Sequence, residues 1–236
     1  MAAGWLGGAF WSIASRGMDR MSEGEWQHLS DGARELARDR RDNVTLRCKD
    51  GRVAKTFELK RWLSSGLLLP YARRFQRSSL ELERRGVPAP RVDGLFARDE
   101  ARRHVVTYDW VEGRDLREAF RDGDEVALVG TLADFVGRLH AQGILFRTFH
   151  FGNVLVLSSG AMGLLDIVDV RFTRRGGASA SRIAGNLSQL LRYPEDEAAL
   201  RRHARAFATR YRAAASLDAR VSAALDRADI GWLTRE

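Results

Sequence analysis

The hydrophobic pattern of this chain is mainly strand-like before about residue 110 and mainly helical after it, and that change limits the possible fold more than any other feature. Before this point, short runs alternate between apolar and polar residues, as strands do. After it, apolar residues recur every three to four positions, which is typical of helices that bury one face. A β-rich part followed by a helical part predicts an α+β fold with two lobes.

This pattern predicts three regions. Residues 22–110 form a small β-rich lobe and residues 111–236 form a reduced helical lobe. Residues 1–21 form a leader, for which disorder is one interpretation and a membrane-surface contact through its short apolar patch is another.

In the first lobe, an Asp50-Gly51 turn separates two alternating runs over 44–48 and 52–57, which predicts a β-hairpin. Lys55 then lies near the middle of the second strand. The spacing of Ser22 and Glu25 matches a capping box at the start of a helix. The other elements predicted before residue 110 are helices over 22–41 and 71–86 and strands over 92–97 and 104–108.

In the second lobe, a second hairpin is predicted over 154–157 and 162–167, around a Ser-Ser-Gly turn. Asn153 precedes this hairpin directly, and Asp166 follows a run of apolar residues in its second strand. Because an unpaired carboxylate is costly in a buried strand, we expect a metal ion or a lysine beside Asp166. The helices predicted here lie over 125–142, from Pro194 onward, and over 217–230.

A long helix, a loop ending in Asn153, a hairpin and then Asp166 together resemble the catalytic core of protein-kinase-like phosphotransferases. Over roughly residues 40–215 the chain is more closely similar to the lipopolysaccharide kinase (Kdo/WaaP-like) family, in its toluene-tolerance-protein branch. The segments that carry this resemblance are Gly51–Phe57, Pro70–Phe75, Arg85–Pro90, Phe146–Asn153 and Asn186–Tyr193.

The resemblance implies a protein-kinase-like two-lobed fold that binds ATP and Mg²⁺. In that case Lys55 would hold the α- and β-phosphates, and Asn153 and Asp166 would be the magnesium ligands. Glu112 would lie in the connecting segment that lines the adenine site. The acceptor would be a lipopolysaccharide core sugar or another envelope glycan.

The chain departs from the family pattern at the position of the loop aspartate, where it has Thr148, and at the usual histidine, where it has Phe146. A threonine hydroxyl is not a general base at neutral pH, so His150 and Asp169 are the candidate substitutes. No glycine-rich phosphate loop precedes Val44. The glutamate that would pair with Lys55 stays open: Glu81 and Glu83 are available, but the spacing favours a position near Phe75 or Gln76.

Three functions therefore remain open. The first is phosphorylation of an envelope glycan, which would make the chain a phosphotransferase. The second is a pseudokinase, which binds nucleotide and serves as an interaction module in envelope or solvent stress tolerance. The third is a basic scaffold that binds anionic lipid.

The positive charge of the chain is concentrated near its end. The net charge is +8, and the residues from Arg171 onward hold 13 arginines but only 7 acidic residues. Arginines such as Arg201, Arg202 and Arg205 often form a solvated helix face, but they could also contact an anionic membrane. Nucleic acid is disfavoured as a partner, because no aromatic interleaving or nucleic-acid motif accompanies the charge.

The compartment is predicted from two further features. The chain contains one cysteine, Cys48, which suits a reducing environment. No apolar run reaches the roughly 20 residues that a membrane-spanning helix needs. We therefore expect a cytoplasmic protein, with peripheral attachment at the inner membrane as the alternative.

Overall fold

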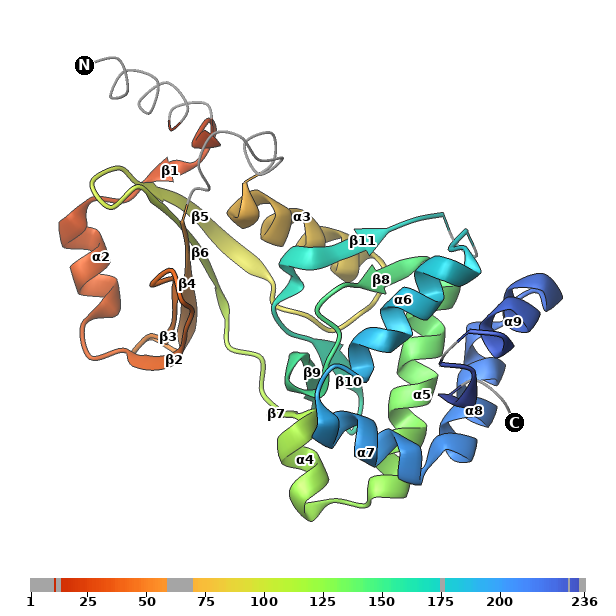
Figure 1. Ribbon diagram of the computed structural model, residues 1–236. Coiled ribbons are helices and arrows are strands. Elements are labelled where there is room, and N and C mark those ends of the chain that lie inside the picture. The colour runs from red at the N-terminus through yellow and green to blue at the C-terminus, as the bar shows by residue number, and fades with distance from the viewer. Residues whose placement is uncertain (1–10, 12–13, 59–69, 175–176, 229, 234–236) are drawn as a thin grey trace. The chain divides into compact units, whose positions relative to one another are not determined.

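The structure is a computed structural model that describes residues 11, 14–58, 70–174, 177–228 and 230–233 (Figure 1). The chain divides into two compact units, Met1–Val111 and Glu112–Glu236. The fold is mixed α+β, with a sheet and two helices described in the first unit and mainly helices in the second. None of the helices in the described ranges has the length and apolar composition needed to cross a membrane.

The described part of the first unit contains one six-stranded sheet with the strand order β1-β5-β6-β4-β3-β2. The parallel pairing of β1 with β5 adds one strand to an otherwise antiparallel sheet. The strands are β1 (Asp19–Arg20), β2 (Arg34–Arg38), β3 (Val44–Arg47), β4 (Arg52–Glu58), β5 (Val92–Arg98) and β6 (Arg103–Asp109), and the helices are α2 (Glu23–Ser30) and α3 (Tyr71–Arg84).

The predicted hairpin is present as β3 and β4. Its turn contains Gly51 at φ +86°, a backbone conformation that glycine adopts without steric cost. Thr45 lies opposite Lys55 in the register of the two strands, and Val106 of β6 lies on the other side of Lys55. Lys55 is therefore in the interior of the sheet, at the middle of β4.

The two faces of the sheet are covered by different helices. Side chains alternate along a strand, so Ala54 and Lys55 point to opposite faces. On the face of Lys55, the Phe75 ring of α3 lies 6.0 Å from the ring of Phe57 and stacks on Tyr108 at 5.5 Å. On the other face, Trp26 and Leu29 of α2 pack against a core of Met21, Cys48, Ala54 and Val105.

The helix predicted over 22–41 is wrong in its second half. The capping box of Ser22 and Glu25 forms as expected, but α2 ends at Ser30. Gly32 then adopts φ +61°, which turns the chain, and Arg34–Arg38 form β2 along the edge of the sheet. Pairing with β3 stabilises an extended conformation here, although the local composition favours a helix.

The first residues of the chain lie partly outside the described residues, at 1–10, 12 and 13. The described part of the predicted leader belongs to the sheet unit. Trp11 is buried and stacks on His104 at a centroid distance of 4.9 Å, and Met18 and Met21 are also buried.

In the second unit, α5 is the central helix and packs along α8. The unit contains the helices α4 (Leu116–Asp122), α5 (Glu125–Ala141), α6 (Ala180–Leu190), α7 (Pro194–Arg202), α8 (Ala204–Ala215) and α9 (Ala219–Asp226). Its short strands are β7 (Arg114–Asp115), β8 (Ile144–Phe146), β9 (Val154–Val156), β10 (Met162–Leu164) and β11 (Val170–Phe172), and its 3₁₀ turns are η1 (Phe151–Asn153), η2 (Ile167–Asp169) and η3 (Gly231–Leu233).

Candidate functional site

The hairpin of β9 and β10 brings Asn153 and Asp166 to the same end. Val154 pairs with Leu164 in the antiparallel register, so the residues that flank the hairpin are neighbours. The amide N–H of Leu165 donates to the carbonyl oxygen of Asn153 at 2.9 Å and extends the pairing by one step. The predicted juxtaposition of Asn153 and Asp166 is therefore present in the backbone of the second unit.

The side chain of Asn153 is held by the loop that precedes it. Its Nδ2 donates to the carbonyl oxygen of Thr148 at 2.9 Å, and its backbone N–H donates to the carbonyl oxygen of His150 at 2.9 Å. The amide nitrogen of Asn153 is therefore engaged with the loop backbone, and Oδ1 is the atom of this side chain that could bind a cation.

The position and exposure of Asp166 differ from those predicted. The strand β10 ends at Leu164, and Asp166 lies beyond it with φ 47° and ψ 52°, a left-handed conformation. Its side chain is exposed, so the argument from an unpaired carboxylate in a buried strand does not apply. A non-glycine residue in this conformation costs free energy, and such residues cluster at functional sites.

Asn153 and Asp166 offer oxygen donors of the kind that Mg²⁺ prefers, an amide oxygen and a carboxylate. The described residues contain no group of three or more His, Cys, Asp or Glu side chains that could form a metal site of their own. The donor set therefore fits a hard cation that takes its remaining ligands from water or from a phosphate.

A buried network anchors the start of this loop. Asn186 of α6 accepts a hydrogen bond from the backbone N–H of Phe146 at 3.1 Å and donates from Nδ2 to the carbonyl oxygen of Phe146 at 2.5 Å. The Nε2 of His140 lies 3.1 Å from Asn186 Oδ1, and its Nδ1 lies 2.8 Å from the Tyr211 hydroxyl. Burial lowers the pKa of His140 to about 4, so the imidazole is neutral at pH 7.

A partly buried ion pair anchors the other end of the loop. Arg117 of α4 makes two hydrogen bonds of 2.9 Å to Asp196 of α7, whose side chain is completely buried. Asp196 also accepts from the backbone N–H of Phe151 at 3.1 Å. The sequence analysis did not identify these residues, because the partners are 79 positions apart and only their acidic and basic character was visible.

The candidate bases lie in and beside this loop. The Thr148 hydroxyl is buried and has no hydrogen-bond partner among the described residues, and the same holds for His150 Nδ1. The His150 ring packs edge-on against Tyr193 at 5.1 Å. Burial and the charge of Arg117 lower its pKa, so that it is neutral at pH 7. Asp169 follows in η2, where its carbonyl oxygen accepts from the Arg147 N–H at 3.3 Å.

In the first unit, Lys55 is close to aromatic rings. Its Nζ lies 5.7 Å from the Phe57 ring centroid and 5.8 Å from that of Phe75. The position of α3 that approaches Lys55 is therefore Phe75, as the spacing suggested. The two available glutamates have arginine partners: Glu81 lies 2.7 Å from Arg85, and Glu83 lies 3.3 Å from Arg91.

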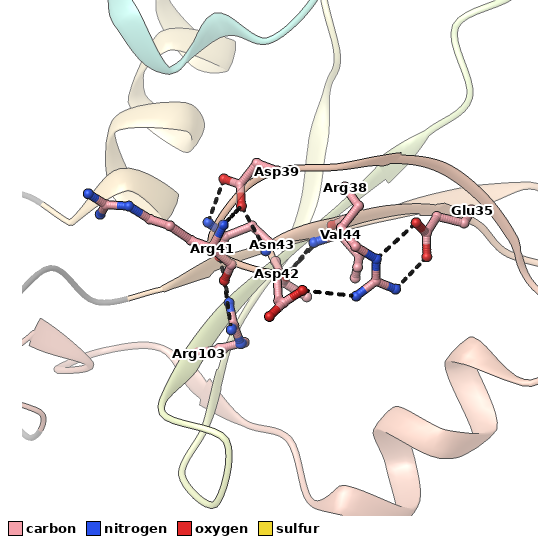
Figure 2. Close-up of polar contacts among 9 residues, drawn as sticks. Glu35, Arg38, Asp39, Arg41, Asp42, Asn43, Val44 and Arg103 are labelled. Carbon is pink, nitrogen blue, oxygen red and sulfur yellow. Dashed lines mark hydrogen bonds and ion pairs between the residues drawn. The ribbon is translucent and has the colours of Figure 1, made fainter.

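The turn between β2 and β3 directly precedes Val44, and Figure 2 shows how it is built. The Asp39 carboxylate accepts hydrogen bonds from the backbone N–H groups of Arg41 at 2.7 Å and Asn43 at 3.0 Å. The Asp42 N–H donates to the Asp39 carbonyl oxygen at 3.1 Å. Asn43 in turn accepts from Arg103 at 2.8 Å. The amides of residues 41–43 are thus engaged within the turn.

Glu112 is the first residue of the second unit and is exposed in the segment before β7. The next residue, Gly113, approaches β9 so closely that a Cβ atom would lie 2.6 Å from the carbonyl oxygen of Val156. A residue with a side chain would therefore displace this segment from the hairpin.

Comparison with known proteins gives little beyond a partial structural likeness. No protein-family model matches the chain, and no curated protein matches it. Among the solved structures that match is the medium-resolution structure of the bifunctional kinase-methyltransferase WbdD, with a TM-score of 0.43 and 16% sequence identity. The match covers 61% of this chain and 33% of that one, so the chain spans about a third of its length.

Proposed function

We propose that the chain is a kinase-like protein that binds ATP with Mg²⁺ and phosphorylates a lipopolysaccharide core sugar or a related envelope glycan. The observation that carries the proposal is that the β9–β10 hairpin brings the backbone of Asn153 and the residues that follow β10, Leu165 and Asp166, to the same end. An amide oxygen and a carboxylate on neighbouring backbone segments are the kinds of group that a magnesium–triphosphate complex takes from its protein.

Each candidate residue then has a defined task. Asn153 Oδ1 and the Asp166 carboxylate hold the metal, and the bound Mg²⁺ neutralises charge on the phosphates during transfer. Lys55 contacts the phosphates from β4, the last described strand before α3. Glu112, in the segment between the two units, supplies backbone groups for the adenine. The turn of residues 39–43 takes no part, because its own carboxylate engages its amides.

In the reaction, a sugar hydroxyl oxygen attacks the γ-phosphorus, the bond from the γ-phosphorus to the bridging oxygen breaks, and ADP leaves. The hydroxyl proton must pass to a base. Thr148 cannot accept it at neutral pH, whereas the neutral imidazole of His150 can, and the Asp169 carboxylate is the other acceptor. Transfer of this kind depends mainly on positioning and charge, so a weak base is compatible with turnover.

The test is transfer of labelled γ-phosphate to purified lipopolysaccharide core oligosaccharide. We expect transfer with the wild type and its loss in Asp166→Ala. The matched control is Asp122→Ala, which removes an exposed carboxylate of α4 that pairs with Arg114 and should leave transfer unchanged. Absence of transfer to every glycan, protein and small-molecule acceptor tried would refute phosphorylation.

A pseudokinase is the second candidate, and the observation that favours it is Thr148. Its hydroxyl stands at the position of the loop aspartate, is buried, and has no partner among the described residues. In this case ATP with Mg²⁺ raises the melting temperature by binding the folded state, but no phosphate is transferred. A gain of transfer in Thr148→Asp would indicate a lost base, and an unchanged melting temperature would contradict both candidates.

A further inference from the structure

The first unit contains a cavity of about 710 Å³ beneath α2, lined by described residues. We call it the α2 cavity. Four of its lining side chains are apolar: Met21 and Cys48, which are buried, and Leu29 and Phe96, which are partly buried. The other lining residues are Gly24 and eight polar or charged residues, among them His28 and Thr107. The volume is within the range of about 300–1,000 Å³ that small-molecule sites occupy.

The α2 cavity lies on the face of the sheet opposite to Lys55. Cys48 belongs to the core cluster that contains Ala54, and Ala54 and Lys55 alternate along β4. Leu29 of α2 packs against the same cluster. The cavity is therefore separate from the residues to which we assign nucleotide binding, and its occupant would be a different molecule.

The charged groups around the α2 cavity balance one another. Three are basic and three are acidic: Arg20, Lys49, Arg52, Glu25, Asp31 and Asp50. Lys49 pairs with Asp31 at 2.7 Å, and Arg52 pairs with Asp50 at 2.8 Å. Arg20 pairs with Asp99, and Glu25 is engaged in the capping box. A charged ligand would have to compete with these internal pairs, whereas an uncharged one would not.

Gly24 has no structural reason to be a glycine. It is the second residue of α2, where glycine is a poorer helix former than alanine, and its φ is not positive. A Cβ atom built on Gly24 would meet no atom within 4 Å. Because Gly24 lines the α2 cavity, the effect of the missing side chain is to leave that wall open.

We propose that the α2 cavity is a binding site for an uncharged, mainly apolar small molecule. The ligand packs against Met21, Leu29, Cys48 and Phe96 and enters past Gly24. This site is independent of the proposed kinase function, and it assigns α2 the role of forming one wall of a ligand pocket on the face of the sheet opposite to Lys55.

The test is titration of the full chain with Nile red, an uncharged apolar dye whose fluorescence rises on burial. We expect one site per chain and at least fivefold weaker binding of the sulfonated dye 1-anilinonaphthalene-8-sulfonate. Gly24→Leu should weaken Nile red binding at least tenfold without lowering the melting temperature, because leucine is the better helix former. The matched control is Gly185→Leu on α6, which also has no atom within 4 Å of its Cβ and should bind as the wild type does.

A second readout needs no substitution. Cys48 is the chain's single cysteine, so alkylation by N-ethylmaleimide reports on the α2 cavity alone. Saturating Nile red should slow this alkylation at least fivefold. The proposal is overturned if the wild type does not bind the dye, if Gly24→Leu binds it with unchanged affinity, if the sulfonated dye binds equally well, or if the dye does not protect Cys48.

Discussion

At the scale of single residues, the second unit depends on polar groups that are buried but satisfied. His140 is 1% exposed and contacts Tyr211 and Asn186, and Asn186 holds both the N–H and the carbonyl oxygen of Phe146. A hydrogen-bond network of this kind holds its residues in one geometry. A buried polar group that lost its partner would cost the full free energy of its desolvation. The loop that carries Asn153 thus starts from a fixed point.

The buried imidazole of His140 should make the second unit sensitive to acid. Its pKa is about 4 in the folded state and 6.5 when unfolded, so the unfolded chain binds more protons between these values. Stability is therefore fully present above pH 6.5 and falls as the pH approaches 4. When the pH is lowered from 7 to 4.5, the free energy of unfolding of the wild type should fall. We expect the fall to be about 2.5 kcal/mol smaller in His140→Gln.

The measurement is urea unfolding at both pH values, followed by the tertiary signal of the second unit. Equal acid sensitivity of His140→Gln and the wild type would show that His140 is not the responsible group.

The Arg117–Asp196 pair should be the most sensitive point of the loop. Asp196→Ala leaves the Arg117 guanidinium with only its 3.7 Å contact to Glu195 and leaves the Phe151 N–H without its acceptor, and we expect a loss of stability of about 2–3 kcal/mol. Replacing the exposed Asp122, which pairs with Arg114, should cost less than about 1 kcal/mol. Chemical denaturation of the two alanine variants measures the difference, and equal losses would contradict this role of Asp196.

At the scale of elements, alanine substitutions at two glycines with left-handed backbone conformations allow the energetic cost of backbone strain to be distinguished from that of a steric clash. Gly143 connects α5 to β8 at φ +71°, and an added Cβ would lie 2.4 Å from the carbonyl oxygen of Arg174. Gly160, in the β9–β10 turn, has φ +79° and open space around it. Gly160→Ala should lower the free energy of unfolding by about 1 kcal/mol, through backbone strain alone. Gly143→Ala should lower it by at least about 2 kcal/mol more, because the clash is added to the strain.

Thermal and urea unfolding of the two variants measure this difference directly. Gly143 also accepts hydrogen bonds from the Thr173 N–H at 2.7 Å and from its hydroxyl at 3.2 Å, so a shift there would disturb the entry to β8 as well. If the two alanine variants were equally stable, the close approach of the Arg174 carbonyl would have no energetic consequence.

The elements that could be predicted from the sequence are those whose signals are local. The β3–β4 hairpin has an alternating pattern and an Asp-Gly turn, α5 has a continuous apolar stripe, and α7 begins with proline and three acidic residues. The strand β2 carries no such signal, because its residues, mostly polar or charged, lie along the sheet edge and owe their conformation to pairing with β3. Its misassignment as helix follows from that.

The candidate site also has one part that the sequence predicts and another that it does not. The hairpin pattern alone was enough to bring Asn153 and the end of β10 together, because residues flanking a tight hairpin must be neighbours, although Asp166 lies beyond the strand and not within it. The groups that hold the loop were not predictable, since His140 meets Asn186 across 46 positions and Arg117 meets Asp196 across 79. Such contacts depend on how helices pack, which no local pattern records.

At the scale of the whole molecule, much of the positive charge is compensated locally. Within the described residues of the second unit, arginines on the last helices contact acidic residues: Arg201 with Glu197, Arg202 with Glu125, Arg210 with Asp134 and Arg212 with Asp226. Exposed pairs of this kind contribute little stability, but they reduce the field that an anionic surface would meet.

The division into two units leads to a prediction about nucleotide binding that rests on the proposed function. Lys55 belongs to the first unit, and Asn153 and Asp166 belong to the second. A ligand that uses all three must therefore contact both units, and it stabilises each by its own share of the binding free energy. At 100 times the dissociation constant, the total is about 2.7 kcal/mol.

Hydrogen exchange on the full chain tests this coupling. ATP with Mg²⁺ should slow exchange in β4 of the first unit and in the β9–β10 hairpin of the second. In Lys55→Met and in Asp166→Ala, the protection should fall in both units at once, because the free energy of one shared ligand is lost in either variant. Lys49→Met, which removes an exposed lysine paired with Asp31, should retain full protection. Protection confined to one unit would mean that nucleotide binds there alone and that Lys55 and Asp166 do not share a ligand.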